Sequence, residues 1–300
     1  MRMSLYGGAD SATVSEVVRR VRAAADAGWS SIWFSQGAGL DTHTALAVAA
    51  VQVPEIRLGS AVVPIQGRHP IPLAQQALTV SSAAGEGRFA LGIGVTHAPV
   101  SEGWYGIPYR QVVDQCAEYL PALAGLLRDR KCDIEGEFVV AHAEIGADAA
   151  TPRLLVGALA PRMLWLAGHH ADGTITWMTG PRGLAEHVVP AIQRAAHKAG
   201  RADPPEVVVG LPVCVTDDPR AVRDSLLEPM ARTAGNASYA RMVALEGVEH
   251  PADLAIIGGE DQVLTAVDCL RAAGASELLV NAVGTDADRE RTTAVLACLG

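Results

Sequence analysis

The chain alternates short apolar segments rich in β-branched residues with longer segments of helical periodicity, and this alternation constrains its fold more than any other feature. Strands are predicted at residues 3–6, 30–34, 57–63, 89–94, 153–157, 172–177, 206–214 and 277–282. Helices are predicted between and after them, at residues 14–27, 44–52, 70–83, 111–128, 161–169, 184–199, 221–246, 262–273 and 289–299, the segment 221–246 in one piece or two. Regular alternation of this kind requires parallel strands joined by right-handed crossovers.

Eight strand–helix units in about 250 residues or slightly more are what a closed barrel requires. We therefore predict an α/β fold, a (β/α)8 TIM barrel that forms a single domain over residues 1–300. The alternative is an open doubly wound sheet, which favours a GxGxxG motif at the first turn, and Gly7-Gly8 followed by Ala9-Asp10 does not match it. Short loop insertions are predicted at residues 96–110, 131–152 and 231–257, the second with a small hairpin near residues 138–140.

Composition excludes several classes of protein. The net charge is -9 and no long run of Lys or Arg occurs, which argues against nucleic-acid binding and against docking on anionic membranes. No apolar stretch is long enough to span a membrane, and the N-terminus lacks the apolar segment of a signal peptide. The five cysteines form no CxxC pair, so we expect a cytoplasmic protein with reduced thiols and no zinc site.

In a barrel of this type the chemistry lies at the carboxyl ends of the strands. The residues predicted there are rich in Gly, Ala, Trp and amides and poor in carboxylates. A glycosidase needs two positioned acids, and a metal hydrolase needs converging ligands, so neither is favoured. The predicted site is a flat, apolar slot that suits a planar cofactor in hydride transfer with a small-molecule substrate.

Several motifs near these strand ends have two possible interpretations. Gly92 and Gly94 allow close approach of the backbone to a ligand, or they serve packing. Arg68 and Arg162 each lie at the start of a predicted helix, where they could help to bind an anion or simply be solvated. The loop after the fourth strand could supply a general acid and aromatic walls, or form a lid packed by its own side chains: His97, Glu102, Trp104, Tyr105 and Tyr109. His169-His170 precedes a strand, at the end of the barrel opposite the site, and is expected to be structural.

Three long stretches resemble the luciferase-like superfamily. RLGSAVVPIQGRHPIPLAQQALTVSSAAGEGRFALGIGVTH is similar to the third and fourth strand–helix units, PRLLVGALAPRMLWLAGHHADGTITW to the fifth and sixth, and IIGGEDQVLTAVDCLRAAGASELLV to the closing segment. The resemblance implies a TIM barrel that binds the deazaflavin coenzyme F420, or alternatively FMN. The compact length looks more like the F420-dependent branch, and dimerisation is implied as well.

The resemblance also implies a set of contacts. A cis peptide that does not involve proline would fall at Ala61-Val62, behind the cofactor ring. The phosphate would meet the backbone at Gly94–Thr96 and at Leu159–Ala160. Cofactor-binding residues are therefore expected at Gly7, Ser35, Gln36, Ala61, Val62, Arg68, Gly94, Val95, Thr96, Ala158, Leu159, Ala160, Arg162 and Trp177.

One position departs from the family pattern. Where sugar-phosphate dehydrogenases of this family carry Asp-His, this chain has Ser35-Gln36. A neutral amide cannot act as a base, which shifts the expectation from alcohol oxidation to reduction of an activated C=C or C=N bond. Gln36, His97 and Glu102 are the candidate catalytic residues. An FMN-dependent monooxygenase and a non-catalytic flavin-binding barrel remain the alternatives.

Overall fold

Eight parallel strands form a closed barrel in the computed structural model, which describes residues 1–299 except for the side chains of residues 232–234. The barrel strands are β1 (Arg2–Tyr6), β2 (Ser31–Phe34), β3 (Arg57–Ser60), β5 (Phe89–Gly94), β8 (Arg153–Gly157), β9 (Gly173–Trp177), β10 (Glu206–Val215) and β12 (Glu277–Ala282). They pair in this order, and β12 pairs with β1 to close the ring. The (β/α)8 prediction is confirmed, and the closure excludes the open sheet.

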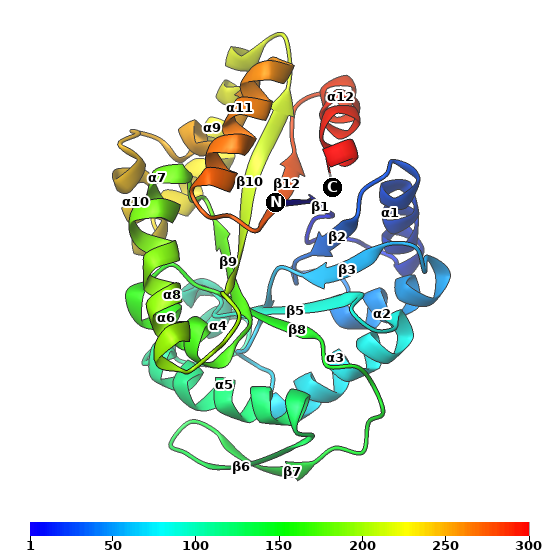
Figure 1. Ribbon diagram of the computed structural model, residues 1–300, viewed down its shortest axis with the longest axis vertical. Helices are drawn as coiled ribbons and strands as arrows, with labels where there is room; N and C mark the ends of the chain where they lie inside the picture. Colours follow the sequence, from blue (N-terminus) through cyan, green and yellow to red (C-terminus); the bar gives the residue numbers. More distant parts are fainter. Residues whose placement is uncertain (300) are drawn as a thin grey trace.

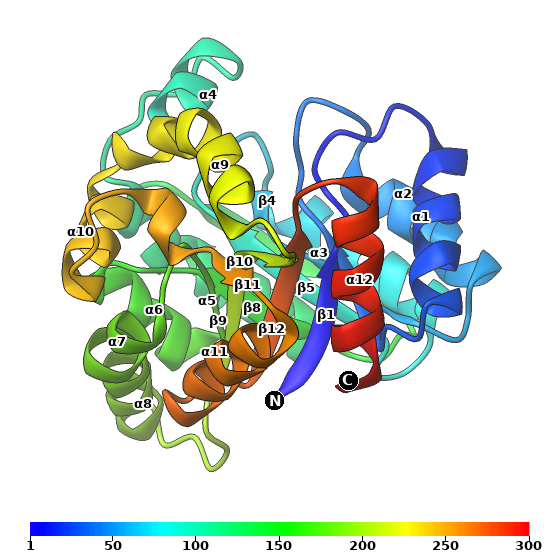
Figure 2. The same ribbon diagram turned by 90° about the horizontal axis from the view of Figure 1, so that it is seen from above.

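Helices surround the strands on the outside of the barrel (Figures 1 and 2). The longer ones are α1 (Val14–Asp26), α2 (Thr42–Gln52), α3 (Pro70–Ala84), α5 (Val112–Arg128), α6 (Pro161–His170), α8 (Val189–Lys198), α9 (Pro219–Ala234), α10 (Ala237–Glu246), α11 (Glu260–Ala272) and α12 (Asp286–Leu296). No helix within residues 1–299 is long and apolar enough to cross a membrane. The amino terminus and the last described residues lie close together in both views (Figures 1 and 2).

Three predicted elements differ in detail from those observed. The third strand, expected at residues 57–63, is interrupted after Ser60 and resumes as β4 (Val63–Pro64), which pairs with β5. The segment expected to be helical at residues 221–246, in one piece or two, forms two helices, because Asn236 caps a new start at α10. The helix expected at residues 184–199 begins with a π-helical turn, η1 (Leu184–Val188).

The predicted insertions carry small elements of their own. The segment after β5 contains the short helix α4 (Ala98–Gly103). The second insertion is an antiparallel hairpin of β6 (Lys131–Glu135) and β7 (Val140–Glu144). The third contains α10, the 3-10 turn η2 (Pro251–Leu254) and β11 (Ile256–Gly258), which pairs with β10.

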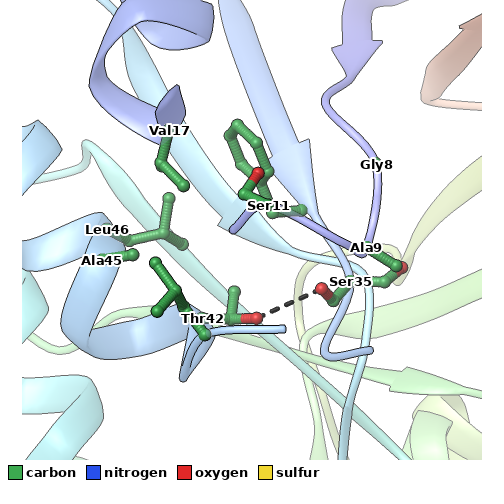
Figure 3. A pocket seen from close by; sticks show the side chains of 10 residues that line it. Gly8, Ala9, Ser11, Val17, Ser35, Thr42, Ala45 and Leu46 are labelled. Carbon is green, nitrogen blue, oxygen red and sulfur yellow. Dashed lines mark hydrogen bonds between the residues drawn. The ribbon is translucent and has the colours of Figure 1, made fainter. Parts of the chain in front are cut away.

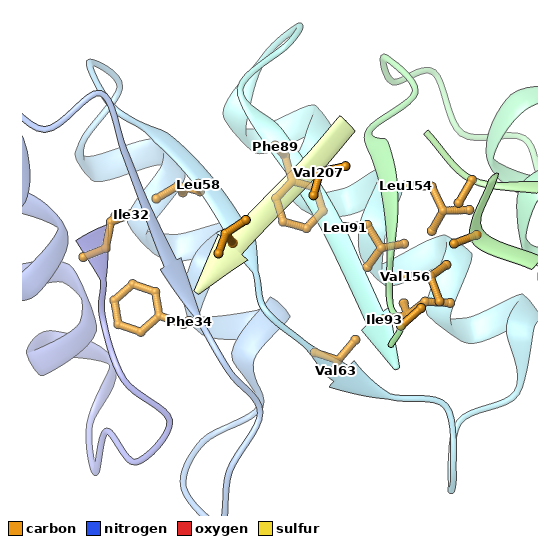
Figure 4. Close-up of a cluster of buried hydrophobic side chains, with 14 of the residues drawn as sticks. Ile32, Phe34, Leu58, Val63, Phe89, Leu91, Ile93, Leu154, Val156 and Val207 are labelled. Carbon is orange, nitrogen blue, oxygen red and sulfur yellow. The ribbon is translucent and has the colours of Figure 1, made fainter. Parts of the chain in front are cut away.

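The apolar core has an inner and an outer part because successive strand residues point to opposite faces. The inner cluster fills the barrel with Trp33, Ala90, Leu155, Ile175, Val208 and Leu279. The outer cluster lies between strands and helices, and Figure 4 shows part of it, including Ile32, Phe34, Leu58, Leu91 and Val207. Neighbours such as Ile32 and Trp33, or Val207 and Val208, thus belong to different clusters.

The amino-terminal end of the barrel is closed by a buried carboxylate. Glu277 at the start of β12 is 1% exposed and accepts hydrogen bonds from Arg2 Nε at 2.9 Å and Trp33 Nε1 at 3.1 Å. Arg153 lies 3.8 Å from the same carboxylate. A buried charge of this kind is tolerated because it is paired and hydrogen-bonded. Polar side chains therefore close this end, and the ligand cavity lies at the other.

Candidate active site

A cavity of about 500 Å³ opens at the carboxyl ends of the strands. Its volume lies within the range of small-molecule and cofactor sites. None of the described side chains that line it belongs to Asp, Glu, Lys or Arg. The lining residues are Tyr6, Ser35, Gln36, Ala61, Val62, Pro64, Gly94, Val95, Thr96, His97, Tyr109, Gly157, Ala158, Leu159, Ala160, Met163, Ile175, Trp177, Asn236, Ser238, Tyr239 and Leu279.

The interruption between β3 and β4 forms one wall of this cavity. The peptide between Ala61 and Val62 is cis, at the position that the family resemblance implied. The Val62 side chain lies against two glycines: a Cβ placed on Gly94 would come within 2.9 Å of Val62 Cγ2, and one placed on Gly157 within 3.5 Å of Cγ1. The strand ends of β5 and β8 thus leave the space that Val62 occupies.

Two aromatic rings and a hydroxyl border the same wall. The Tyr6 hydroxyl donates to Ser35 Oγ at 3.0 Å, and the Ser35 hydroxyl contacts the Ala61 carbonyl. The ring centroids of Tyr6 and Trp177 are 5.8 Å apart. Burial raises the pKa of Tyr6, so the phenol stays protonated and a hydrogen-bond donor at neutral pH. Gly210 on β10 makes room for Trp177, since a Cβ there would come within 2.4 Å of the indole ring.

Gln36 lines the cavity, but its amide is fully used within the loop between β2 and α2. Its nitrogen donates to the carbonyls of Gly37 and Leu40, both at 3.1 Å. Its oxygen accepts from Thr42 N at 3.0 Å and from Arg68 at 3.3 Å. Gln36 therefore stabilises the loop between β2 and α2, and this position offers neither a base nor a free hydrogen-bond donor.

The amino end of α6 borders the cavity through Ala160 and Met163. Ala160 is the N-cap, and no side chain caps this ten-residue helix. The first N–H groups of an uncapped helix carry partial positive charge and suit a phosphate. His187 Nε2 donates to the Leu159 carbonyl at 2.7 Å and fixes the preceding turn. At the other expected phosphate contact, Thr96 N–H already donates to Gln66 Oε1 at 3.0 Å.

The mouth of the cavity is built by two insertions that meet. His97 and Tyr109 come from the segment between β5 and α5, while Asn236, Ser238 and Tyr239 come from the start of α10. The Asn236 side-chain nitrogen lies 3.2 Å from His97 Nδ1. The rings of His97 and Tyr239 are 6.3 Å apart, and burial raises the pKa of Tyr239. These contacts make one polar rim, without Asp, Glu, Lys or Arg among its described residues, over the apolar wall.

Most of the residues expected at the site line the cavity: Ser35, Gln36, Ala61, Val62, Gly94, Val95, Thr96, His97, Ala158, Leu159, Ala160 and Trp177. Four do not. Gly7 packs under the Phe34 ring, and Arg68 forms an ion pair with Asp41 at 2.9 Å behind Gln36. The Arg162 side chain is 70% exposed and contacts Asp114 at 2.5 Å. Glu102 is exposed and accepts from Tyr109 N at 3.0 Å, which places it in the framework of the loop.

No individual residue of α10 was singled out from the sequence, although α10 lies in the insertion predicted at residues 231–257. Asn236 is 139 positions from His97, and no local pattern links the two. The sequence did contain a signal for a helix start at Asn236, in the Asn-x-Ser spacing of residues 236–238, because Asn is a preferred N-cap. Tyr6 was also missed, since a single Tyr at a strand end has no distinguishing pattern.

A second, much smaller pocket of about 20 Å³ lies under the loops that follow β1 and β2. Figure 3 shows it between Ser11, Thr42, Leu46 and Val17, beside the hydrogen bond of 3.1 Å from Thr42 Oγ1 to the Ser35 carbonyl. The buried Ser11 hydroxyl has no protein partner. The space suits about one water molecule and is too small for a substrate.

No group of three or more His, Cys, Asp or Glu side chains among the described residues could hold a metal ion. His169 stacks on Trp165, with ring centroids 4.8 Å apart, on the outer surface of α6. All five cysteines are free.

The fold, the cavity at the strand ends and the cis peptide agree with a match to a family model, the luciferase-like monooxygenase family, over residues 2–277. The chain belongs to the luciferase-like monooxygenase family. The family resemblance predicted from sequence is thereby confirmed.

Among curated relatives, the chain is 28% identical over 212 residues to a 5,10-methylenetetrahydromethanopterin reductase of Methanolobus tindarius, covering 70% of this chain. It is 36% identical over 100 residues, 33% of this chain, to a candidate coenzyme F420-dependent oxidoreductase of Mycobacterium tuberculosis. The matched regions span only 64% and 28% of the lengths of those two proteins.

Solved structures share the fold over the whole chain. An F420-dependent secondary alcohol dehydrogenase in complex with an F420–acetone adduct superposes with a TM-score of 0.83 at 14% identity, covering 100% of this chain and 99% of that one. The oxygenating constituent of 3,6-diketocamphane monooxygenase from Pseudomonas putida, in complex with FMN, has a TM-score of 0.75 at 18% identity, with 99% and 97% coverage. Proteins that share this fold thus include an oxidoreductase that uses F420 and a monooxygenase in complex with FMN.

Proposed function

We propose that this protein is an F420-dependent reductase that adds hydride to an activated C=C or C=N bond of a small molecule. The observation that carries the proposal is the cavity itself. It has a backbone-lined wall at Ala61-Val62, an uncapped helix start at Ala160 and no charged side chain among its described lining residues. A planar ring fits the wall, and a phosphate fits the helix start.

The residues present fit a deazaflavin. Val62, flanked by Gly94 and Gly157, would support one face of the ring, and Trp177 and Tyr6 would border its edge. Ala160 and Leu159 would hold the phosphate through backbone N–H groups. When bound in its reduced form, F420 supplies a hydride. The chain's own residues then have to bind and orient the substrate and present hydrogen-bond donors.

The proposed direction rests on Gln36. Oxidation of an alcohol needs a base that removes the hydroxyl proton. Gln36 has no such capacity, and its amide is already engaged with Leu40 and Thr42. The only imidazole that lines the cavity among the described residues is that of His97. Reduction needs only hydrogen-bond donors at this rim, because the proton that follows the hydride can come from solvent.

A second candidate is an FMN-dependent monooxygenase. The family model and the FMN-bound relative of the same fold support it. A third is a flavin-binding barrel without catalysis, and the occupied amide of Gln36 keeps it open. The proposal also retains the small-molecule substrate, the homodimer and the cytoplasmic location expected from the sequence.

The test is a panel of unsaturated carbonyl compounds and imines mixed with reduced F420 and the purified protein. The expected result is oxidation of F420 that depends on both protein and substrate. Oxygen uptake with reduced FMN and no turnover of F420 would favour the monooxygenase. Cofactor binding without turnover in either assay would favour the non-catalytic barrel.

A further inference from the structure

The hydrogen bond that joins the two insertions has a definite direction. Asn236 is the N-cap of α10, and its side-chain oxygen accepts from Ser238 N–H at 2.9 Å. The other end of the same amide, the Nδ2 group, lies 3.2 Å from His97 Nδ1. The helix cap therefore decides which end of the Asn236 amide faces the imidazole, because a reversed amide would lose the cap.

An amide nitrogen only donates hydrogen bonds. His97 Nδ1 must therefore accept, which leaves the ring proton on Nε2. A proton on Nδ1 would point at the hydrogens of Asn236 Nδ2. We infer that Asn236 is a positioning residue that holds His97 as the neutral Nε2–H tautomer, so that His97 offers a hydrogen bond, not a proton, to the substrate.

This inference revises the role expected for His97. A neutral imidazole is too weak an acid to give up its remaining proton near neutral pH, but its N–H can polarise a carbonyl or imine. The other polar side chains of the rim, including Tyr109 and Tyr239, are uncharged. Burial raises the pKa of both phenols, so they remain neutral as well.

The substrate class follows, and this part rests on the proposed function. A neutral rim that offers N–H and O–H groups suits a neutral molecule with an acceptor atom, a carbonyl oxygen or imine nitrogen conjugated to the bond that is reduced. A carboxylate or ammonium group would enter a cavity without a countercharge in its described lining, which is costly. The reduction adds one hydride and one proton, and the proton comes from solvent.

The tautomer is tested by NMR of protein carrying 15N-labelled histidine, with the His97 signals assigned by their loss in His97→Gln. Asn236→Ser keeps a good N-cap but is too short to reach the ring. Asn236→Asp also keeps the cap, but its free carboxylate oxygen can only accept. We expect the Nε2–H form in the wild type, an Nε2–H to Nδ1–H ratio about fivefold smaller in the Ser variant, and a proton on Nδ1 in the Asp variant.

The result that overturns the inference is a His97 proton distribution unchanged across the three proteins, or a wild-type ring protonated on Nδ1. This readout needs no cofactor, so it stands or fails separately from F420 binding. Activity provides the second arm. His97→Gln retains a donor near the position of Nε2, whereas His97→Leu has none, so the Gln variant should keep a kcat/KM about tenfold above that of the Leu variant. Equal loss in both variants would contradict a donor role.

Discussion

The contact between Gly94 and Val62 allows a sharp test of how the barrel builds its cofactor wall. In Gly94→Ala the new Cβ would lie 2.9 Å from Val62 Cγ2, inside the carbon–carbon optimum of about 3.5–4.0 Å. Valine is stiff about its side-chain torsion, so Val62 cannot swing away freely. Gly94 does not have a positive φ, so the backbone itself accepts alanine.

The cost of such overpacking is about 1–3 kcal/mol. If Val62 relieves the contact by moving into the cavity, the cost falls on ligand binding, and the Kd for F420 should rise about 5- to 150-fold. If Val62 does not move, the cost lowers the free energy of unfolding and should lower the Tm by roughly 2–4 °C per kcal/mol. Fluorescence titration and thermal unfolding measure the two effects.

Two variants control the experiment. Gly157→Ala places its Cβ 3.5 Å from Val62 Cγ1, an ordinary contact, and should cost clearly less than Gly94→Ala in both measurements. The double variant Val62→Ala/Gly94→Ala removes the obstructing methyl groups and should recover part of the loss. Wild-type affinity and Tm in Gly94→Ala would refute the reasoning, as would an equal loss in Gly157→Ala.

Two further predictions concern buried groups. Burial lowers the pKa of His43 from 6.5 to about 4, with Arg68 adding to the effect and Asp41 opposing it. Between these two pH values the unfolded chain binds a proton at His43 and the folded chain does not, so the free energy of unfolding should fall by up to about 3 kcal/mol as pH drops from 6.5 to 4. Denaturant unfolding of His43→Gln should show a smaller decline over the same pH range. An unchanged decline would count against this assignment. Burial also raises the pKa of Cys116 to about 12 and that of Cys214 to about 11, whereas Cys269 and Cys298 are exposed. Mass spectrometry after brief alkylation of the native protein should find the two exposed thiols modified first, and early labelling of Cys116 would contradict the packing of α5.

The barrel could be predicted from sequence because short, largely buried strands alternate regularly with longer helical segments. Local signals did not reveal the break in the third strand, because residues 57–63 read as one continuous strand; only the family resemblance placed a cis peptide at Ala61-Val62. The helical segment at residues 221–246 was expected in one piece or two, and the N-cap Asn236 divides it into α9 and α10.

The candidate site was predictable where it depends on strand ends and unpredictable where it depends on long-range contacts. The chain order of the strands brings Ala61, Gly94 and Ala158 to one rim. The rest of the site depends on which partner each long polar side chain contacts. Arg162 pairs with Asp114 of α5 and so lies outside the cavity, and the Gln36 side chain accepts a hydrogen bond from Thr42 N, so that its amide is not free to bind a ligand. Local sequence does not encode which partner a long polar side chain finds.

The central claim is that this cavity binds the deazaflavin. The most direct measurement is a fluorescence titration of the purified protein with F420 and, in parallel, with FMN. The account predicts micromolar or tighter binding of F420, weaker binding of FMN, and a reduced F420 affinity in Gly94→Ala. Tight retention of FMN with no binding of F420 would contradict it.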